Sequence, residues 1–337
     1  MAQSNVLARY RKWLVWALLV GIVAYGGLAM WSDSQKVGHE LRNFKWAFFV
    51  PVILLTLANY ALRCVKWIYL LGRLNTEIST KNAIRIFLAG LAMTISPAKA
   101  GELLKPYLVA KRSNVSMATA TSALVAERLT DIIAIVCLTA LSLAAIGGAK
   151  SGNHELQLAI ISGCIVVGLL ILAHERSSLG LISLCGKIPF VGRIAPKLEE
   201  LYRGMRNCLA PAPFLITTGL SVVAWAFECF GYYYVFKAMG IDASLAMATF
   251  IYATGTVIGG LLAIFPGGVG PAEGSMIGLC KSPSMLGLSA SQAMTSALMV
   301  RLATLWLGVI IGAFVLLRMS DLLEDTDLEQ LQSPDPA

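Results

Sequence analysis

The sequence predicts an all-α polytopic membrane protein, and three observations support that prediction. Hydrophobic residues make up 57% of the chain and charged residues only 14%, whereas soluble domains carry about 25% charged residues. Several apolar runs reach the length of a spanning helix, which is about 20 residues. These runs lack the alternation of apolar and polar residues that is typical of outer-membrane barrel strands. The sequence therefore favours a helical bundle over a barrel.

Six apolar runs are long enough to form full spans, and two shorter ones are interrupted. The full spans are expected at residues 13–30, 46–71, 117–146, 156–173, 213–238 and 290–317. The interrupted segments lie near 83–112 and 250–281, where proline, glycine and charged residues break the apolar pattern. Each is expected to be a re-entrant hairpin that enters and leaves on one side. A fold with eight full spans is the alternative.

The distribution of charge predicts the orientation. The positive-inside rule places residues 9–12, the 73–112 region and the 175–206 loop in the cytoplasm. Six spans and two hairpins then leave both termini there, in a bacterial-type inner membrane. The acidic segment 319–337 is expected to be a disordered cytoplasmic tail, and residues 1–318 a single transmembrane domain. The net charge of +8 suits an anionic lipid or membrane surface better than nucleic acid.

The segment 196–209 has the pattern of an amphipathic helix. Leu198, Leu201, Tyr202 and Met205 share one helical face, and the other face is charged. The helix either lies along the cytoplasmic membrane surface or packs on the bundle as an ordinary loop helix.

An internal repeat relates the two interrupted segments. Each has a proline, a glycine four residues later, a glutamate soon after, and then a TSAL sequence followed by an arginine. The positions are Pro97, Gly101, Glu102 and Arg128 in one copy, and Pro266, Gly270, Glu273 and Arg301 in the other. Three full spans separate equivalent points, so the copies run in opposite directions, as in transporters with broken helices. Broken backbone at membrane depth needs protein, water or substrate as partner, which predicts a wet cavity.

Several charges interrupt the apolar spans. Glu127, Arg128 and Asp131 lie in the middle of one span, and Glu228 lies in the middle of another. Because a charge at mid-bilayer costs about 2.5–3.5 kcal/mol, these groups must pair with other charges or face water. They form either a salt-bridge network that locks the bundle or a site for a headgroup or ion. Glu228 is either protonated and structural or part of proton coupling.

No cofactor or metal is expected. The seven cysteines are scattered without a CxxC pair, and the three histidines do not cluster with them. The sequence also contains no Walker A motif, so ATP is not expected to drive the protein directly.

The charged and glycine-rich motifs follow one another in a distinctive order. They are Arg63-x-x-Lys66-Trp67, Pro97-x-x-x-Gly101-Glu102-x-x-Lys105, Glu127-Arg128-x-x-Asp131, Pro266-Gly267-Gly268-Val269-Gly270 with Glu273, and Arg301. In this order they resemble the flippase-like family, which includes the transmembrane region of lysylphosphatidylglycerol synthase. The resemblance covers residues 10–318 and implies a membrane-embedded lipid translocation module. Members of the family are tied to aminoacyl-phospholipids, lipid-linked sugars and hopanoids.

The sequence departs from the family pattern at three positions. Lys99 and Lys105 stand where arginine is expected, and Ala272 stands where a basic residue is expected. Arginine and lysine are not equivalent at a phosphate site, so these differences bear on the identity of the headgroup. No cytosolic aminoacyl-transferase domain is expected after the last span, and the chain is not expected to aminoacylate lipids.

The leading hypothesis is an inner-membrane translocase for an anionic lipid, either a phospholipid or a polyprenyl-phosphate-linked sugar. The residues expected to bind its phosphate are Arg63, Lys66, Lys99, Lys105, Arg128 and Arg301. Those expected to orient these cations or to couple charge are Glu102, Glu127, Asp131, Glu228 and Glu273. Those expected to shape the hairpins are Pro97, Gly101, Pro266, Gly267, Gly268 and Gly270. No catalytic residue is predicted.

Two other functions compete with this hypothesis. One is a membrane-embedded lipid-phosphate or glycosyl transferase, which the absence of a DxD-type acidic cluster disfavours. The other is a non-transporting partner of a separately encoded lipid-modifying or glycosyl-transfer enzyme.

Overall fold

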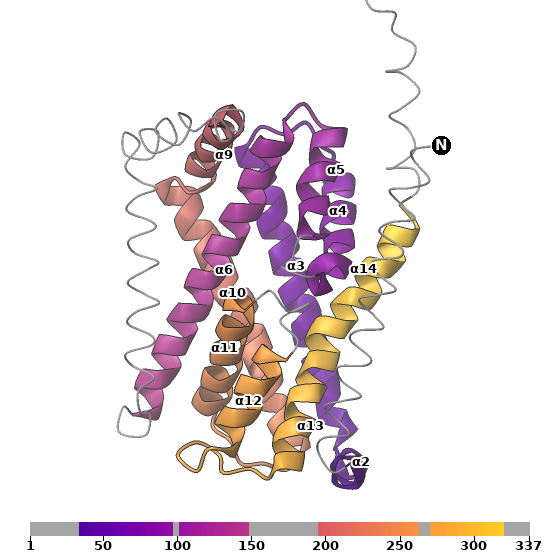
Figure 1. The fold of residues 1–337 in the computed structure, drawn as a ribbon, viewed down its shortest axis with the longest axis vertical. Coiled ribbons are helices and arrows are strands. Elements are labelled where there is room, and N and C mark those ends of the chain that lie inside the picture. The colour runs from indigo at the N-terminus through magenta and orange to yellow at the C-terminus, as the bar shows by residue number, and fades with distance from the viewer. Residues whose placement is uncertain (1–33, 97–100, 148–194, 263–269, 320–337) are drawn as a thin grey trace, which may run out of the picture.

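The computed structural model describes residues 34–96, 101–147, 195–262 and 270–319, which are helical almost throughout (Figure 1). Four helices in these ranges are long and apolar enough to cross a membrane: Trp46–Arg73, Met117–Ile146, Pro211–Ala238 and Ala290–Leu317. They confirm the all-α membrane fold and agree with four of the expected spans. The spans expected at 13–30 and 156–173, and the tail 320–337, lie outside the described residues.

The first half of the fold is a span, a hairpin and a second span, preceded by a short helix. Its elements are α2 (Ser34–Asn43), η1 (Trp46–Phe48), α3 (Phe49–Arg73), α4 (Thr80–Ala92), η2 (Met93–Ile95), α5 (Leu104–Arg112) and α6 (Met117–Ile146). Serines cap two of these helices. The Ser79 hydroxyl accepts from the Asn82 backbone N–H before α4, and the Ser116 hydroxyl accepts from Thr119 before α6.

The second half repeats this order after the helix α9 (Ala195–Cys208). Its elements are α10 (Pro211–Ala238), α11 (Leu245–Leu261), α12 (Pro271–Lys281), α13 (Ala290–Arg301), η6 (Leu302–Trp306) and α14 (Leu307–Leu317). Caps again explain where helices begin, because Ser244 and Ser289 accept backbone N–H groups at the starts of α11 and α13. The element η6 is a π-helical turn, and it joins α13 and α14 into one continuous span.

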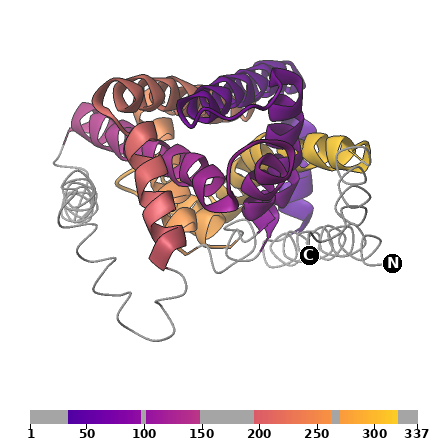
Figure 2. The ribbon, with the colours of Figure 1, turned by 90° about the horizontal axis from the view of Figure 1, so that it is seen from above.

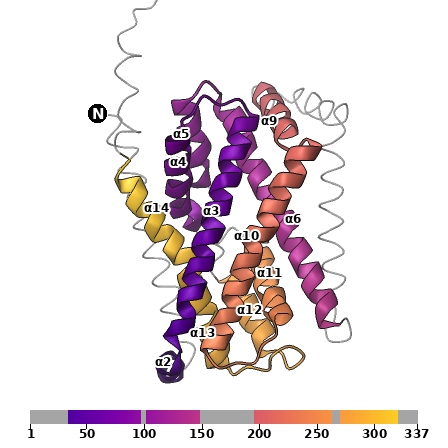
Figure 3. The same cartoon turned by 180° about the vertical axis from the view of Figure 1, so that it is seen from behind.

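The two hairpins enter the bundle from opposite ends. Figure 1 shows α4 and α5 at one end and α11 and α12 at the other, and Figure 3 shows the same from behind. Within each hairpin the two helices leave the bundle at the same end, as re-entrant segments do. The 13 residues of α4 extend only about 20 Å, less than the thickness of the hydrocarbon layer. Two halves with the same order and opposite direction form the arrangement that an inverted repeat requires.

Each half has its own apolar core. One cluster surrounds Trp67, Phe87 and Leu108 in the first half, and another surrounds Tyr232 and Phe236 in the second. The halves meet where α3 and α10 lie side by side along one face of the bundle (Figure 2).

Two close approaches fix how the halves meet. The Asn59 amide donates to the Ala224 carbonyl at 2.8 Å, which joins α3 to α10. Gly312 of α14 lies against α4, where a Cβ atom would fall 2.3 Å from the Ala92 nitrogen. The first hairpin is therefore packed directly against the last span of the second half.

The amphipathic segment predicted at 196–209 corresponds to α9, which packs on α6. The Ser122 hydroxyl donates to the Leu201 carbonyl at 2.9 Å, and Gly204 allows this approach because it has no side chain. Of the two placements expected for this helix, the structure contains the packing on the bundle. Whether its outer face also meets a membrane stays a prediction.

Candidate functional site

A cluster of seven charged side chains lies between α3, the first hairpin and α6. We call this set the charge cluster; its members are Arg63, Lys66, Glu102, Lys105, Glu127, Arg128 and Asp131. The widest gaps between them along the chain are the 36 positions from Lys66 to Glu102 and the 22 positions from Lys105 to Glu127. The folding of the hairpin between the two spans brings them together.

Both lysines of the charge cluster are buried in ion pairs. Lys66 Nζ lies 2.5 Å from Asp131 Oδ1 and 2.7 Å from the Ser221 hydroxyl of α10. Lys105 Nζ lies 2.5 Å from Glu127 Oε2. Because a buried charge is tolerated when it is paired and hydrogen-bonded, these contacts explain how two lysines fit inside an apolar bundle. In this arrangement Lys66 and Lys105 are members of one salt-bridge network.

The position of Lys105 depends on a glycine in the other helix of its hairpin. A Cβ atom at Gly90 would fall 2.7 Å from the Lys105 side chain, so the lysine stem occupies the space that a larger residue would fill. Its ammonium group lies 3.9 Å from the centre of the Trp67 ring and 5.1 Å from that of Phe87. These distances suit cation–π contacts, which further stabilise the buried charge.

The same glutamate–arginine pair occurs in both halves. Arg128 Nε lies 2.8 Å from Glu102 Oε2, and Arg301 Nε lies 2.6 Å from Glu273 Oε1. Glu102 lies two residues before α5, and Glu273 lies in the first turn of α12. In each pair the arginine lies in the span that follows. The features that recur in the sequence thus form equivalent contacts in the structure.

Gly270 holds the second glutamate in place. Its backbone N–H donates to Glu273 Oε2 at 2.7 Å, which caps the start of α12. Gly270 has a backbone φ of 99°, a conformation that residues with a Cβ atom rarely adopt. This requirement agrees with the hairpin-shaping role predicted for it.

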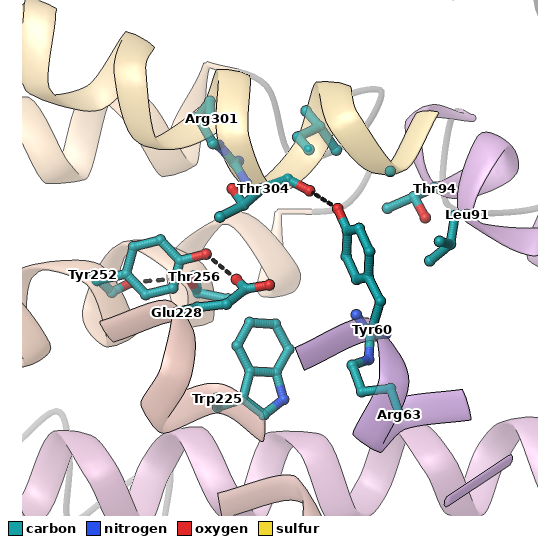
Figure 4. Close-up of a pocket in the computed structure, with 12 residues that line it drawn as sticks. Tyr60, Arg63, Leu91, Thr94, Trp225, Glu228, Tyr252, Thr256, Arg301 and Thr304 are labelled. Atoms are coloured by element: carbon teal, nitrogen blue, oxygen red, sulfur yellow. Dashed lines mark hydrogen bonds between the residues drawn. The ribbon is translucent and has the colours of Figure 1, made fainter. Parts of the chain in front are cut away.

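A cavity of about 90 Å³ lies between the two hairpins, near the middle of α3 and α10. It is large enough for several water molecules. We call it the central cavity; the residues that line it are Tyr60, Arg63, Leu91, Thr94, Trp225, Glu228, Tyr252, Thr256, Arg301, Thr304, Leu305 and Gly308 (Figure 4). Both halves contribute, since α4 and η2 belong to the first hairpin and α11 to the second.

Arg63 connects the charge cluster to the central cavity. Its Nη2 atom lies 3.6 Å from Glu127 Oε1 and 3.8 Å from Asp131 Oδ2, which is too long for good hydrogen bonds. Its buried Nε atom has no hydrogen-bond partner among the described residues. The guanidinium also lies 5.6 Å from the centre of the Trp225 ring. Arg63 therefore has hydrogen-bond donors available to a molecule in the cavity.

The second half supplies the opposite wall of the central cavity. Glu228 of α10 accepts a hydrogen bond from the Tyr252 hydroxyl of α11. The Tyr60 hydroxyl donates to the Thr304 backbone carbonyl, which lies in the π-helical turn η6 (Figure 4). A π-helical turn changes the backbone hydrogen-bond pattern of a helix and is frequent at functional sites.

The structure divides the predicted site residues into two groups that meet at Arg63. Arg63, Glu228 and Arg301 line the central cavity. The members of the charge cluster other than Arg63 lie beside it, and the Arg128 side chain is 29% exposed at its edge. The backbone N–H of Gly101 donates to the Ser96 hydroxyl at 2.8 Å in the hairpin turn. The remaining predicted residues, Pro97, Lys99, Pro266, Gly267 and Gly268, lie outside the described ranges.

The sequence did not single out the aromatic and hydroxyl residues of the central cavity. Tyr60 precedes Arg63 by three positions, and Trp225 precedes Glu228 by three. Thr304 follows Arg301 by three positions. Residues three apart share a helical face, so the neighbours of each mid-span charge were the available signal.

The comparisons with known proteins agree with the fold. Residues 15–312 match the family described as the lysylphosphatidylglycerol synthase TM region. A UPF0104 membrane protein of Methanothermobacter thermautotrophicus is 22% identical, over 86% of this chain and 90% of its own length. Another, from Methanocaldococcus jannaschii, is 24% identical over 89% of this chain and 91% of its own length. A Haloferax volcanii protein named glycosyltransferase AglD is 22% identical over 78% of this chain and 48% of its own length.

The family match includes α3, both hairpins and most of the last span. The chain therefore belongs to the family of the lysylphosphatidylglycerol synthase transmembrane region.

Proposed function

We propose that this protein moves an anionic lipid across the membrane and binds the phosphate of its headgroup in the central cavity. The lipid is a phospholipid or a polyprenyl-phosphate-linked sugar, and ATP does not drive the movement directly. The proposed location is a bacterial-type inner membrane with both termini in the cytoplasm. The family of the chain and its membrane fold are the starting point for this proposal.

The proposal depends on the environment of Arg63. Its side chain is only 11% exposed, lines the central cavity and makes no hydrogen bond to the described residues. A buried guanidinium with available donors suits a phosphate, because its planar fork binds two oxygens at once. Glu127 and Asp131 lie close enough to hold the arginine in position without using its donors.

Arg301 supports the same proposal from the other half. It lines the central cavity from α13 and is oriented by Glu273. A phosphate in the cavity would thus meet one arginine from each half of the inverted repeat. Lys66 and Lys105 would contribute positive charge from behind, because their ammonium groups are already bonded to carboxylates.

The proposal is tested with purified protein in vesicles that contain fluorescently labelled phosphatidylglycerol or a labelled polyprenyl-phosphate sugar. We expect the wild type to expose inner-leaflet label to an external quencher. A labelled glycolipid without phosphate should stay in its leaflet. Movement of neither phosphate-bearing lipid, or equal movement of the phosphate-free lipid, would contradict the proposed function.

The variant Arg63→Ala links the movement to the cavity. Hydrogen bonds to charged groups contribute about 1.5–3 kcal/mol, so we expect lipid affinity to fall roughly tenfold to a hundredfold. Arg63→Lys keeps the charge but loses the fork, and we expect an intermediate loss. Arg42→Ala in α2 is the matched control, because Arg42 lies in an exposed segment away from the cavity.

A second candidate is a non-transporting partner of a sugar-transferring enzyme. The relative named glycosyltransferase AglD matches this chain over only 48% of its own length, so the shared region is one part of that protein. The vesicle measurement separates the candidates, because a partner would retain lipid or bind an enzyme without moving the labelled lipids.

The chain itself acting as a transferase has less support. Glu102, Glu127, Asp131 and Glu273 each lie within hydrogen-bond distance of an arginine or lysine nitrogen. Carboxylates that are already paired are poor ligands for a metal–diphosphate group.

A further inference from the structure

Glu228 differs from the other carboxylates inside the described bundle. Glu102, Glu127, Asp131 and Glu273 each have a basic partner. Glu228 is only 4% exposed, yet no lysine, arginine or histidine nitrogen of the described residues lies within 4.0 Å of it. Its hydrogen bond in these ranges comes from the neutral Tyr252 hydroxyl.

The groups around Glu228 come from four other elements. These are Tyr60 and Arg63 from α3, Asp131 from α6, Tyr252 from α11 and Arg301 from α13. The two arginines line the same cavity as Glu228 without an ion pair to it. Figure 4 shows the second carboxylate oxygen of Glu228 pointing away from Tyr252, toward the side of the cavity that holds Tyr60.

An ionised carboxylate without a partner is costly inside a membrane protein unless other charges or water stabilise it. Burial disfavours the ionised form of Glu228, and the positive charges of Arg63 and Arg301 oppose this effect. A phosphate that binds both arginines would cancel that charge and add negative charge of its own beside Glu228. The ionised form of Glu228 then becomes unfavourable. Because Glu228 lines the cavity, its carboxylate can take a proton from water there.

We propose that Glu228 takes up one proton when an anionic phosphate headgroup enters the central cavity. The inference rests on the proposed function and adds the coupling ion to it. Uptake forms an O–H bond on the carboxylate with a proton from cavity water, and release returns that proton to water when the headgroup leaves. No electron is transferred. Because linkage is reciprocal, protonation of Glu228 must also strengthen headgroup binding.

The test measures proton uptake on binding, which does not require transport. Soluble dihexanoyl phosphatidylglycerol is titrated into the detergent-purified full chain by calorimetry in two buffers with different ionisation enthalpies. We expect about one proton to be taken up per lipid bound at pH values where Glu228 is ionised in the free protein. Over that pH range the affinity for the lipid should fall by up to about tenfold for each unit by which the pH rises.

Glu228→Gln mimics the protonated carboxyl group and keeps its shape. We expect this variant to bind the lipid with no proton uptake and with an affinity that does not change with pH. Glu77→Gln is the matched control, since Glu77 is an exposed glutamate in the loop before α4. It should retain the wild-type proton uptake. An unfolding measurement on each variant establishes that the fold is kept.

A second variant keeps the inference testable if Glu228→Gln fails to fold. Tyr252→Phe removes the hydroxyl that donates to Glu228. Because that hydrogen bond favours the ionised carboxylate, its loss should move the pH dependence of lipid binding to higher pH. Infrared spectra should follow this shift in the carbonyl band of the protonated carboxyl group.

The outcomes separate this inference from the proposed function. If the wild type binds no phosphate-bearing lipid, the proposed function fails and the inference fails with it. If the lipid binds with no proton uptake, or if Glu228→Gln takes up protons as the wild type does, only the inference is overturned.

Discussion

The two halves of this fold have the same frame and fill it with different side chains. Counted from the paired glutamates Glu102 and Glu273, the third residue onward is Lys105 in the first half and Met276 in the second. Counted from the paired arginines, the preceding residue is Glu127 in the first half and Val300 in the second. The buried Lys105–Glu127 ion pair thus has an apolar counterpart, since Met276 and Val300 belong to one hydrophobic cluster.

This difference separates what the fold requires from what the first half adds. Both halves keep the glutamate–arginine pair that ties a hairpin to its following span. Buried ion pairs are often no more stabilising than well-packed apolar residues of similar volume. The second half uses apolar packing at the equivalent positions, so stability alone does not explain the lysine and glutamate of the first half.

The largest effect is expected from breaking this ion pair on one side. Lys105→Met leaves the buried Glu127 without its closest partner, and we expect a loss of about 3–5 kcal/mol in unfolding free energy. The double variant Lys105→Met/Glu127→Val copies the second half and should recover most of that loss. Denaturant unfolding in detergent measures both.

Lys81→Met is the matched control for that experiment. Lys81 is exposed at the start of α4, and its replacement should change the stability by less than about 0.5 kcal/mol. A double variant that stays as unstable as Lys105→Met would show that the first half cannot adopt the apolar pattern of the second.

An intermediate effect is expected from the glycines at the two hairpin interfaces. A Cβ atom at Gly259 would fall 2.6 Å from the Ala272 Cβ atom, which can move only with its backbone. At Gly90 the close atoms belong to the flexible Lys105 stem. We therefore expect Gly259→Ala to cost about 1–3 kcal/mol and Gly90→Ala to cost less.

Gly278→Ala provides the reference for these substitutions, measured by thermal unfolding. No atom lies within 4 Å of a Cβ placed at Gly278 in α12, so this change should be neutral or slightly stabilising. If Gly90→Ala cost more than Gly259→Ala, the lysine-filled interface would be the more rigid of the two.

The smallest effect is expected at the hydrogen bond that joins the halves across the central cavity. Tyr60→Phe removes the donor to the Thr304 carbonyl, and we expect a loss of about 0.5–1.5 kcal/mol. Tyr69→Phe in the same helix is the control, because no hydrogen bond joins its hydroxyl to the described residues. Equal stability of the two variants would mean that the Tyr60 hydrogen bond does not hold the halves together.

The sequence was sufficient for the class of fold, the hairpins and the repeated glutamate–arginine order, because these depend on patterns within one segment. It could not assign which cations are buried. The position of Lys105 depends on Gly90, which belongs to the other helix of the hairpin. The sequence alone does not state which helical faces meet.

The lining of the central cavity was hidden for a similar reason. Tyr252 lies in an apolar run and reads as a packing residue until α10 brings Glu228 to its hydroxyl. Trp225 likewise gains its meaning from Arg63, which belongs to a helix in the other half. Contacts between halves of a repeat join residues that are far apart in the chain, and no local pattern records them.

The last span consists of two helical arms that contact different parts of the molecule. Its lower arm, α13, carries Arg301 to the central cavity, and its upper arm, α14, is seated on the first hairpin through Gly312 and Ala92. The π-helical turn at Leu302–Trp306 lies between the two arms. A tilt of the first hairpin must carry α14 with it, so labels on α4 and α14 should keep a constant distance while labels on α13 and α14 need not. The first hairpin and α14 thus form one packed unit, and the π-helical turn separates that unit from the helix that carries Arg301.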